Sequence, residues 1–207
     1  MRTTLGPVNA RVLTALFLLA AFALGAVALA GVSRDQPLAE DGPRRFEGAT
    51  LPAGLRAPNF VLHDQDGERI RMRELRGEPV IVSFLYTTCE DTCPSQAQQV
   101  RAALDELGED VPAVAVAVDP RRDTPDSARA FLARQRLTGR MDFALGTRDQ
   151  LAPVWRGFAV EPQRDDLEHT ARLVLVDPDG VQRVSYPLDQ VTAERLAHDL
   201  RLLQAGV

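Results

Sequence analysis

An α/β fold is predicted for residues 57–207, and three features of the sequence support it. Short, β-rich apolar runs alternate with segments of helical spacing between residues 80 and 145. The run from Val111 to Val118 is almost continuously apolar, which is typical of a parallel strand covered on both faces. Two further strand patterns, joined by the turn Asp177–Gly180, and a last helical pattern complete the chain.

The first predicted element is a β-hairpin, in which Asn59–His63 and Glu68–Met72 flank a turn that contains Gly67. The elements that follow are a buried strand at 80–86, a helix at 97–107, a strand at 111–118, a helix capped by Thr124 and ending near Leu137, a short strand at 142–146, a helix capped by Thr147, strands at 171–176 and 181–186, and a helix at 192–203. Strand, helix, strand, helix, hairpin and helix is the thioredoxin layout. The sequence therefore predicts a thioredoxin-like fold with an extra N-terminal β-hairpin and an insertion before the final hairpin.

The N-terminal region predicts one transmembrane helix. Val12 to Val32 is nearly all apolar, and 21 helical residues span about 31 Å, enough for a bilayer. This length favours an uncleaved anchor, with a cleaved signal ending at Ala28-Leu29-Ala30 as the alternative. In either case we expect residues 1–11 in the cytoplasm and residues 33–56 as a linker. The domain at 57–207 is then expected on the outer, periplasmic side of the cytoplasmic (inner) membrane.

Composition narrows the classes of partner. The chain is 45% hydrophobic and 26% charged, as globular proteins are, and its net charge is −5. Because this balance is acidic, nucleic acid is not an expected partner.

The only two cysteines, Cys89 and Cys93, directly follow the predicted strand at 80–86. Pro94 comes next and is tolerated at the first position of a helix, so the pair is expected on a strand-to-helix turn. The positive end of the helix dipole should then favour the thiolate of Cys93 and lower its pKa. Two thiolates four residues apart can close a disulfide or hold one soft metal ion.

His169 is the predicted third member of the site. It lies in the loop before the final hairpin, which faces the cysteine turn in a thioredoxin layout. Two thiolates and an imidazole suit copper, whereas a closed zinc site would usually need a fourth ligand. The alternative is a plain disulfide in an exported domain, which would leave His169 unused. The loop Asp119–Pro125 either forms surface ion pairs at a helix start or orients the metal turn.

Three motifs, in family order, resemble those of the Sco/SenC family of copper chaperones for cytochrome c oxidase assembly. They are Cys89–Pro94, Asp119–Pro125, and His169-Thr170 before the strand that leads to Asp177–Gly180. The resemblance covers about Ala57 to the C-terminus. It implies a thioredoxin-like fold that binds one copper ion, Cu(I) or Cu(II), through Cys89, Cys93 and His169, with the two cysteines also acting as a redox pair. Glu90 and Thr92 depart from the usual Pro and Val of the family turn, which changes its charge and stiffness.

The resemblance also implies a function and partners. Family members deliver copper to the dinuclear copper centre of cytochrome c oxidase subunit II, or reduce the cysteines of that centre. Subunit II is therefore the expected partner, with other periplasmic copper chaperones or thiol reductases as further partners.

Other thiol proteins fit the sequence less well. The main alternative is a membrane-anchored thiol–disulfide oxidoreductase without a copper role. Such proteins use a CxxC pair and a cis-proline before the facing strand, but here the spacing is one residue longer and residues 169–171 contain no proline. A peroxiredoxin would need a proline upstream of its reactive cysteine, which Tyr86-Thr87-Thr88-Cys89 lacks.

Overall fold

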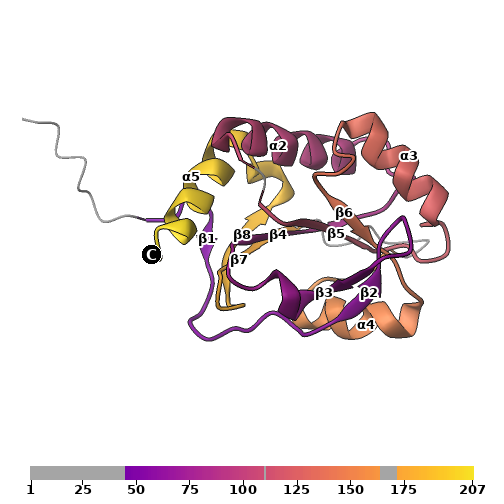
Figure 1. Ribbon diagram of the computed structural model, residues 1–207, viewed down its shortest axis with the longest axis horizontal. Helices are drawn as coiled ribbons and strands as arrows, with labels where there is room; N and C mark the ends of the chain where they lie inside the picture. The colour runs from indigo at the N-terminus through magenta and orange to yellow at the C-terminus, as the bar shows by residue number, and fades with distance from the viewer. Residues whose placement is uncertain (1–44, 110, 164–171) are drawn as a thin grey trace, which may run out of the picture. The chain divides into compact units, whose positions relative to one another are not determined.

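A mixed β-sheet of six strands lies at the centre of the folded unit (Figure 1). The structure is a computed structural model, and it describes residues 45–109, 111–163 and 172–207. The strands are β1 (Ala49–Thr50), β4 (Val80–Leu85), β5 (Ala113–Ala117), β6 (Asp142–Ala144), β7 (Arg172–Val176) and β8 (Gln182–Pro187). They are ordered β1-β8-β7-β4-β5-β6. Parallel pairing joins β4 to β5 and β5 to β6, whereas β7 is antiparallel to both β4 and β8.

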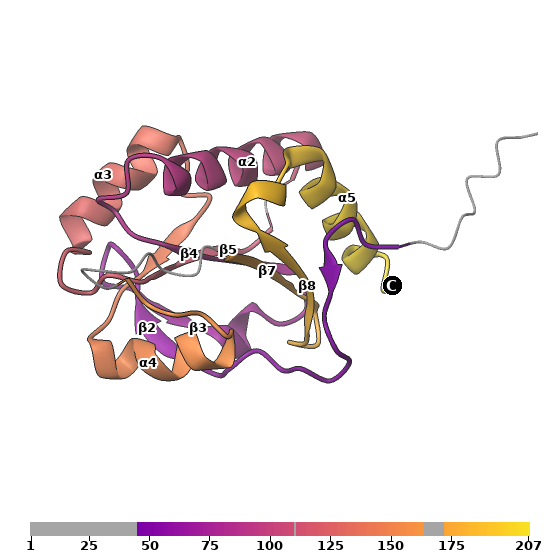
Figure 2. The same ribbon diagram turned by 180° about the vertical axis from the view of Figure 1, so that it is seen from behind.

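Helices cover both faces of this sheet. They are α2 (Thr92–Leu107), α3 (Pro125–Gln135), α4 (Arg148–Gly157) and α5 (Ala193–Gln204), with short 3-10 helices η1 (Met72–Leu75) and η2 (Leu188–Gln190). Figures 1 and 2 show α2, α3 and α5 on one face and α4 on the other. Every residue of β4 and β5 is buried between these layers, as the apolar runs predicted. Both predicted caps are confirmed, because the hydroxyls of Thr124 and Thr147 accept the first-turn N–H groups of α3 and α4.

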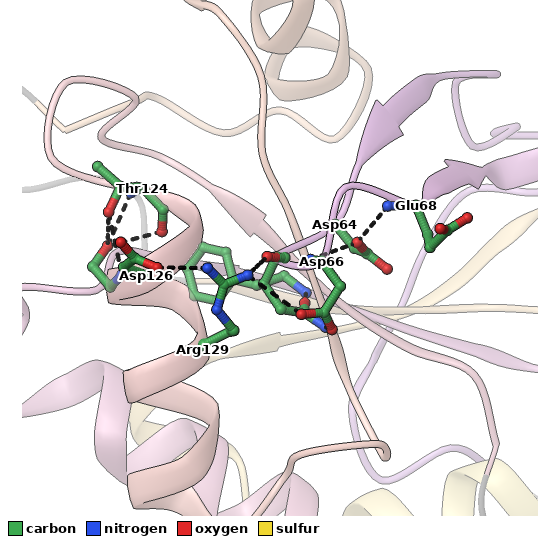
Figure 3. Close-up of polar contacts among 9 residues, drawn as sticks. Asp64, Asp66, Glu68, Thr124, Asp126 and Arg129 are labelled. Carbon is green, nitrogen blue, oxygen red and sulfur yellow. Dashed lines mark hydrogen bonds and ion pairs between the residues drawn. The ribbon is translucent and has the colours of Figure 1, made fainter.

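The predicted N-terminal hairpin is confirmed as a separate two-stranded sheet, formed by β2 (Val61–His63) and β3 (Arg69–Arg71). Asp64 Oδ1 shapes its turn by accepting the N–H groups of Asp66 and Glu68, both at 2.8 Å. Arg129 on α3 holds this turn, since its guanidinium donates to the carbonyl of Gln65 and lies 3.3 Å from Asp66 Oδ1 (Figure 3). The hairpin turn is thereby joined to the helix that follows the Asp119–Pro125 loop.

The N-terminal boundary of the folded unit differs from the expected one. Residues 45–56 fall in the predicted linker, yet β1 pairs with β8 and this segment belongs to the same compact unit as the sheet. Gly48 allows the close approach, because a Cβ there would lie 2.4 Å from Val184 Cγ1. A two-residue strand with exposed side chains has no hydrophobic period, so the sequence pattern gave no sign of it.

The predicted transmembrane helix at 12–32 lies outside the described residues, as do residues 1–11 and residues 33–44 of the predicted linker. In the described ranges, no helix has the length and apolar character needed to cross a bilayer.

Candidate metal centre

The two cysteines lie where β4 leads into α2. The N–H of Cys89 donates to the carbonyl of Tyr86 at 3.3 Å, which closes the turn after the strand. The helix begins at Thr92, earlier than predicted, so Cys93 lies inside its first turn. The N–H of Cys93 donates to Cys89 Sγ at 3.1 Å, and Thr92 Oγ1 lies 3.3 Å from the same sulfur. Since Asp91 makes no side-chain cap, the sulfur of Cys89 serves as the acceptor at the helix N-terminus.

This arrangement gives the two thiols different acidities. Burial alone would raise the pKa of Cys89, but hydrogen bonds with Cys93 and Thr92 outweigh burial and lower it. Burial raises the pKa of Cys93 far above its ordinary range, and the hydrogen bond to Cys89 adds to that rise. The prediction that the helix dipole favours a thiolate at Cys93 is therefore wrong. Cys93 lies within the helix, whereas Cys89 precedes it and receives the free N–H of the first turn.

Cys89 is also the more exposed of the two cysteines. The exposed fraction is 9% for Cys89 and 1% for Cys93, and both are free thiols in this structure. An open pocket of about 450 Å³ borders the turn. The residues that line it are Thr87, Thr88, Cys89, Glu90, Pro94, Arg134 and Gln135. Of the two sulfur atoms, that of Cys89 is therefore the more accessible from this pocket.

The donor set fits a soft metal ion. Two sulfur atoms within one hydrogen-bonded turn, one of them with a lowered pKa, are the type of ligand that selects Cu(I). No group of three or more His, Cys, Asp or Glu side chains with metal-binding geometry occurs among the described residues. The predicted third ligand, His169, lies outside them.

The Asp119–Pro125 loop is hydrogen-bonded to the segment that leads into the cysteine turn. Asp123 Oδ1 accepts the N–H of Thr87 at 2.7 Å and its hydroxyl at 2.9 Å, and Asp123 Oδ2 accepts the N–H of Asp119 at 3.1 Å. Burial raises the pKa of Asp123 to about 6, although the hydrogen bonds from Thr87 oppose the rise. The Thr87 hydroxyl also lies 3.0 Å from Ser127 Oγ on α3. Thr87 was not singled out from the sequence, because its partner Asp123 is 36 residues away.

Gln96 is a second residue that the sequence did not single out. It lies on α2, one turn after Cys93, with an exposed fraction of 1%. Its Nε2 donates to the carbonyl of Arg172 at 3.3 Å. Arg172 is the first described residue after the segment that contains His169. Gln163 is the last described residue before that segment, and its N–H donates to the carbonyl of Val118 at 3.0 Å.

Comparison with known proteins identifies the family. The SCO1/SenC family model matches residues 49–204. The chain belongs to the SCO1/SenC family. The human mitochondrial protein SCO1 homolog is 24% identical over 172 residues, covering 77% of this chain and 56% of that protein. This chain thus spans little more than half the length of that SCO1 relative.

Solved structures of Sco proteins share the fold. The structure of Bradyrhizobium japonicum ScoI with copper bound is 30% identical, with a TM-score of 0.62 over 72% of this chain and 99% of that chain. BsSco, described as a member of the Sco family of cytochrome c oxidase assembly proteins with a disulfide switch, is 24% identical, with a TM-score of 0.64 over 76% of this chain and 98% of that chain. The predicted family and the mixed α/β, thioredoxin-like fold are confirmed. Relatives of this chain bind copper, as the cofactor prediction expects.

Proposed function

We propose that this chain is a copper-binding chaperone that delivers copper to the dinuclear copper centre of cytochrome c oxidase subunit II, or reduces the cysteines of that centre. The observation that carries the proposal is the hydrogen-bonded pair of free thiols, with Cys89 facing an open pocket, in a member of the SCO1/SenC family. The relatives named above support both parts, since one holds copper and another belongs to the oxidase assembly proteins.

Cys89, Cys93 and His169 are the proposed ligands of one copper ion. Thiolate is the form that binds metal, so binding would release the proton that Cys93 holds through its raised pKa. Arg172 lies against α2, and the three residues from it back to His169 span at most about 10 Å. One helical turn separates Gln96, which holds Arg172, from Cys93. The length of the chain between Arg172 and His169 therefore allows His169 to reach the cysteine turn, which supports it as the third ligand.

The reductase form of the function uses the same two cysteines. The Cys89 thiolate would attack a partner's disulfide, form a mixed disulfide and release one partner thiolate. Cys93, after losing its proton, would then attack Cys89 Sγ and release the second partner thiolate. Two electrons pass from the Cys89–Cys93 pair to the partner, and the pair becomes a disulfide. The hydrogen bond between the two residues supports this role, because it keeps them adjacent.

The proposed location is the inner membrane, with one span at residues 12–32 and the folded unit on the periplasmic side. The length of the apolar segment and the arginines before it support this topology. A reporter fused after Val207 should be active only in its periplasmic form. Activity of the cytoplasmic form alone would contradict the proposed orientation.

Anaerobic titration of the full-length, reduced chain in detergent with Cu(I) tests copper binding. We expect one copper per chain and, after oxidation, a thiolate-to-Cu(II) charge-transfer band. Cys89→Ala and Cys93→Ala should abolish both signals, and His169→Ala should weaken copper binding by at least about tenfold. His63→Ala is the matched control, because that side chain is exposed at the end of β2 and should leave affinity unchanged. Absence of stoichiometric copper, with a readily reducible Cys89–Cys93 disulfide, would instead favour the thiol–disulfide oxidoreductase.

A further inference from the structure

Three arginines form a basic seam along α2 and the C-terminal end of α3, and we define the seam as Arg101, Arg134 and Arg136. Arg134 and Arg136 are exposed, and neither makes an ion pair within the described part of the chain. Arg101 pairs with Asp105 at 2.7 Å, but Asp105 is shared with Arg140 at 2.6 Å. The seam therefore carries a local positive charge on a chain whose net charge is −5.

The basic seam is continuous with the pocket beside Cys89. Arg134 and Gln135 line that pocket, and they also line a neighbouring one of about 280 Å³ together with Gln98, Arg101 and Arg136. The two helices are joined between these pockets, since Gln98 Nε2 on α2 donates to Gln135 Oε1 on α3 at 3.3 Å. A polar trough thus runs from Cys89 along the seam between the two helices.

The shape and charge of this trough select its occupant. It is open and lined by polar side chains, so it fits an extended chain segment better than an enclosed small molecule. Glu90 and Arg134 both line the pocket beside Cys89, and Arg134 also lines the second pocket together with Arg101 and Arg136. The three arginines attract an acidic segment along the second pocket, whereas Glu90 disfavours acidic residues directly beside Cys89.

We propose that the basic seam docks an acidic segment of the partner protein and thereby presents the partner's cysteines to Cys89. This inference rests on the proposed function for the reactive thiol, and adds the charge of the partner surface. Complementary charge of this kind raises association rates by about tenfold to a thousandfold at low salt. The effect is screened by salt, because the Debye length falls from about 30 Å at 0.01 M to about 3 Å at 1 M.

The test measures thiol–disulfide exchange with two synthetic peptides. Each carries an intramolecular disulfide, flanked by glutamates in one peptide and by lysines in the other. The full-length chain, reduced, in detergent and free of copper, reduces the peptide while its Cys89–Cys93 pair is oxidised. We expect the glutamate peptide to react at least about tenfold faster at low salt, with the ratio approaching one near 1 M salt.

The double variant Arg134→Glu/Arg136→Glu should abolish or reverse this preference. The matched control is Arg148→Glu/Arg156→Glu, which places the same charge change on exposed positions of α4, across the sheet from the basic seam (Figures 1 and 2). It should keep the wild-type ratio.

Equal rates for the two peptides at low salt would overturn the proposal, as would a preference that survives in the seam variant. The proposal would also be overturned if the seam variant lost binding to phosphatidylglycerol vesicles but kept its peptide preference, because the seam would then serve a lipid surface. The peptide assay uses no copper. If the Cu(I) titration failed to show copper binding, the peptide rates would therefore still test the docking proposal by themselves.

Discussion

At the scale of single residues, the two cysteines differ in acidity and in exposure, although their spacing alone does not distinguish them. The sulfur of Cys89 accepts the N–H of Cys93, so the helix N-terminus stabilises the thiolate of the cysteine that precedes the helix. Cys93 is nearly inaccessible and retains its proton through burial. We therefore propose Cys89 as the nucleophile and the first metal contact, and Cys93 as the resolving thiol.

Limited alkylation tests this division. When the reduced chain is treated with substoichiometric iodoacetamide, peptide mass analysis should find Cys89 modified at least about tenfold more than Cys93. Because a lowered pKa keeps the thiolate populated at lower pH, the labelling rate of Cys89 should be half-maximal at a lower pH than that of an ordinary cysteine thiol. A cysteine peptide in the same buffers is the control. Preferential labelling of Cys93, or a Cys89 midpoint at or above the peptide's, would contradict the assignment.

The sequence identified both cysteines but not which one is activated. Spacing and a following proline predict a turn before a helix, but they do not fix the residue at which the helix begins. The helix starts at Thr92 instead of at residue 97, and this shift of more than one turn places Cys93 in the first turn of the helix instead of before it. Pro94 still fits there, because first-turn N–H groups have no intrahelical partner.

At the scale of elements, the turn after β4 depends on the loop that precedes α3. Thr87 connects them, because both its N–H and its hydroxyl donate to Asp123. The strands and helices on either side were predicted from their periodicity, whereas this contact joins residues 36 apart and depends on the parallel pairing of β4 with β5. Parallel pairing brings the C-terminal ends of both strands to one edge, where their loops meet.

Thr87→Val tests this support. The variant keeps the shape of the side chain but removes its hydroxyl, so Asp123 loses one hydrogen bond in a buried position. We expect the free energy of unfolding to fall by about 1–3 kcal/mol, measured by urea denaturation. Thr88→Val is the matched control, since the neighbouring side chain is exposed, and it should change stability by less than about 0.5 kcal/mol. Equal effects of the two substitutions would show that the Asp123 contact does not stabilise the fold.

At the scale of the whole molecule, the folded unit is closed by contacts between its first and last described segments. Asp199 on α5 is fully buried, and its two carboxylate oxygens accept the N–H groups of Glu47 at 2.8 Å and Gly48 at 3.0 Å. The hydroxyl of Tyr186 donates to the same carboxylate at 2.5 Å. Phe46 packs against the core, and its ring lies 5.6 Å from the guanidinium of Arg183. The residues that make these contacts lie far apart in the sequence, so local composition does not reveal them. For this reason the sequence predicted residues 45–56 to be part of a linker.

Two truncated chains decide where the folded unit begins. A chain starting at Ala57, the boundary expected from the sequence, lacks β1 and leaves the buried Asp199 carboxylate without two donors. We expect its free energy of unfolding to be lower by at least about 2 kcal/mol than that of a chain starting at Arg44, because two hydrogen bonds to the buried carboxylate are lost and each costs about 1–3 kcal/mol. Urea denaturation followed by circular dichroism measures the difference.

Asp199→Ala in both truncated chains separates the carboxylate contacts from general packing. In the chain starting at Arg44, the substitution should cost several kcal/mol, because it strands the N–H groups of Glu47 and Gly48 and the Tyr186 hydroxyl. In the chain starting at Ala57, two of those donors are already absent, so the cost should be smaller by at least about 1 kcal/mol. An equal cost in both chains would mean that Asp199 acts through α5 alone. A smaller cost in the chain starting at Ala57 would establish that residues 45–56 are part of the folded unit and are held there by Asp199 on α5.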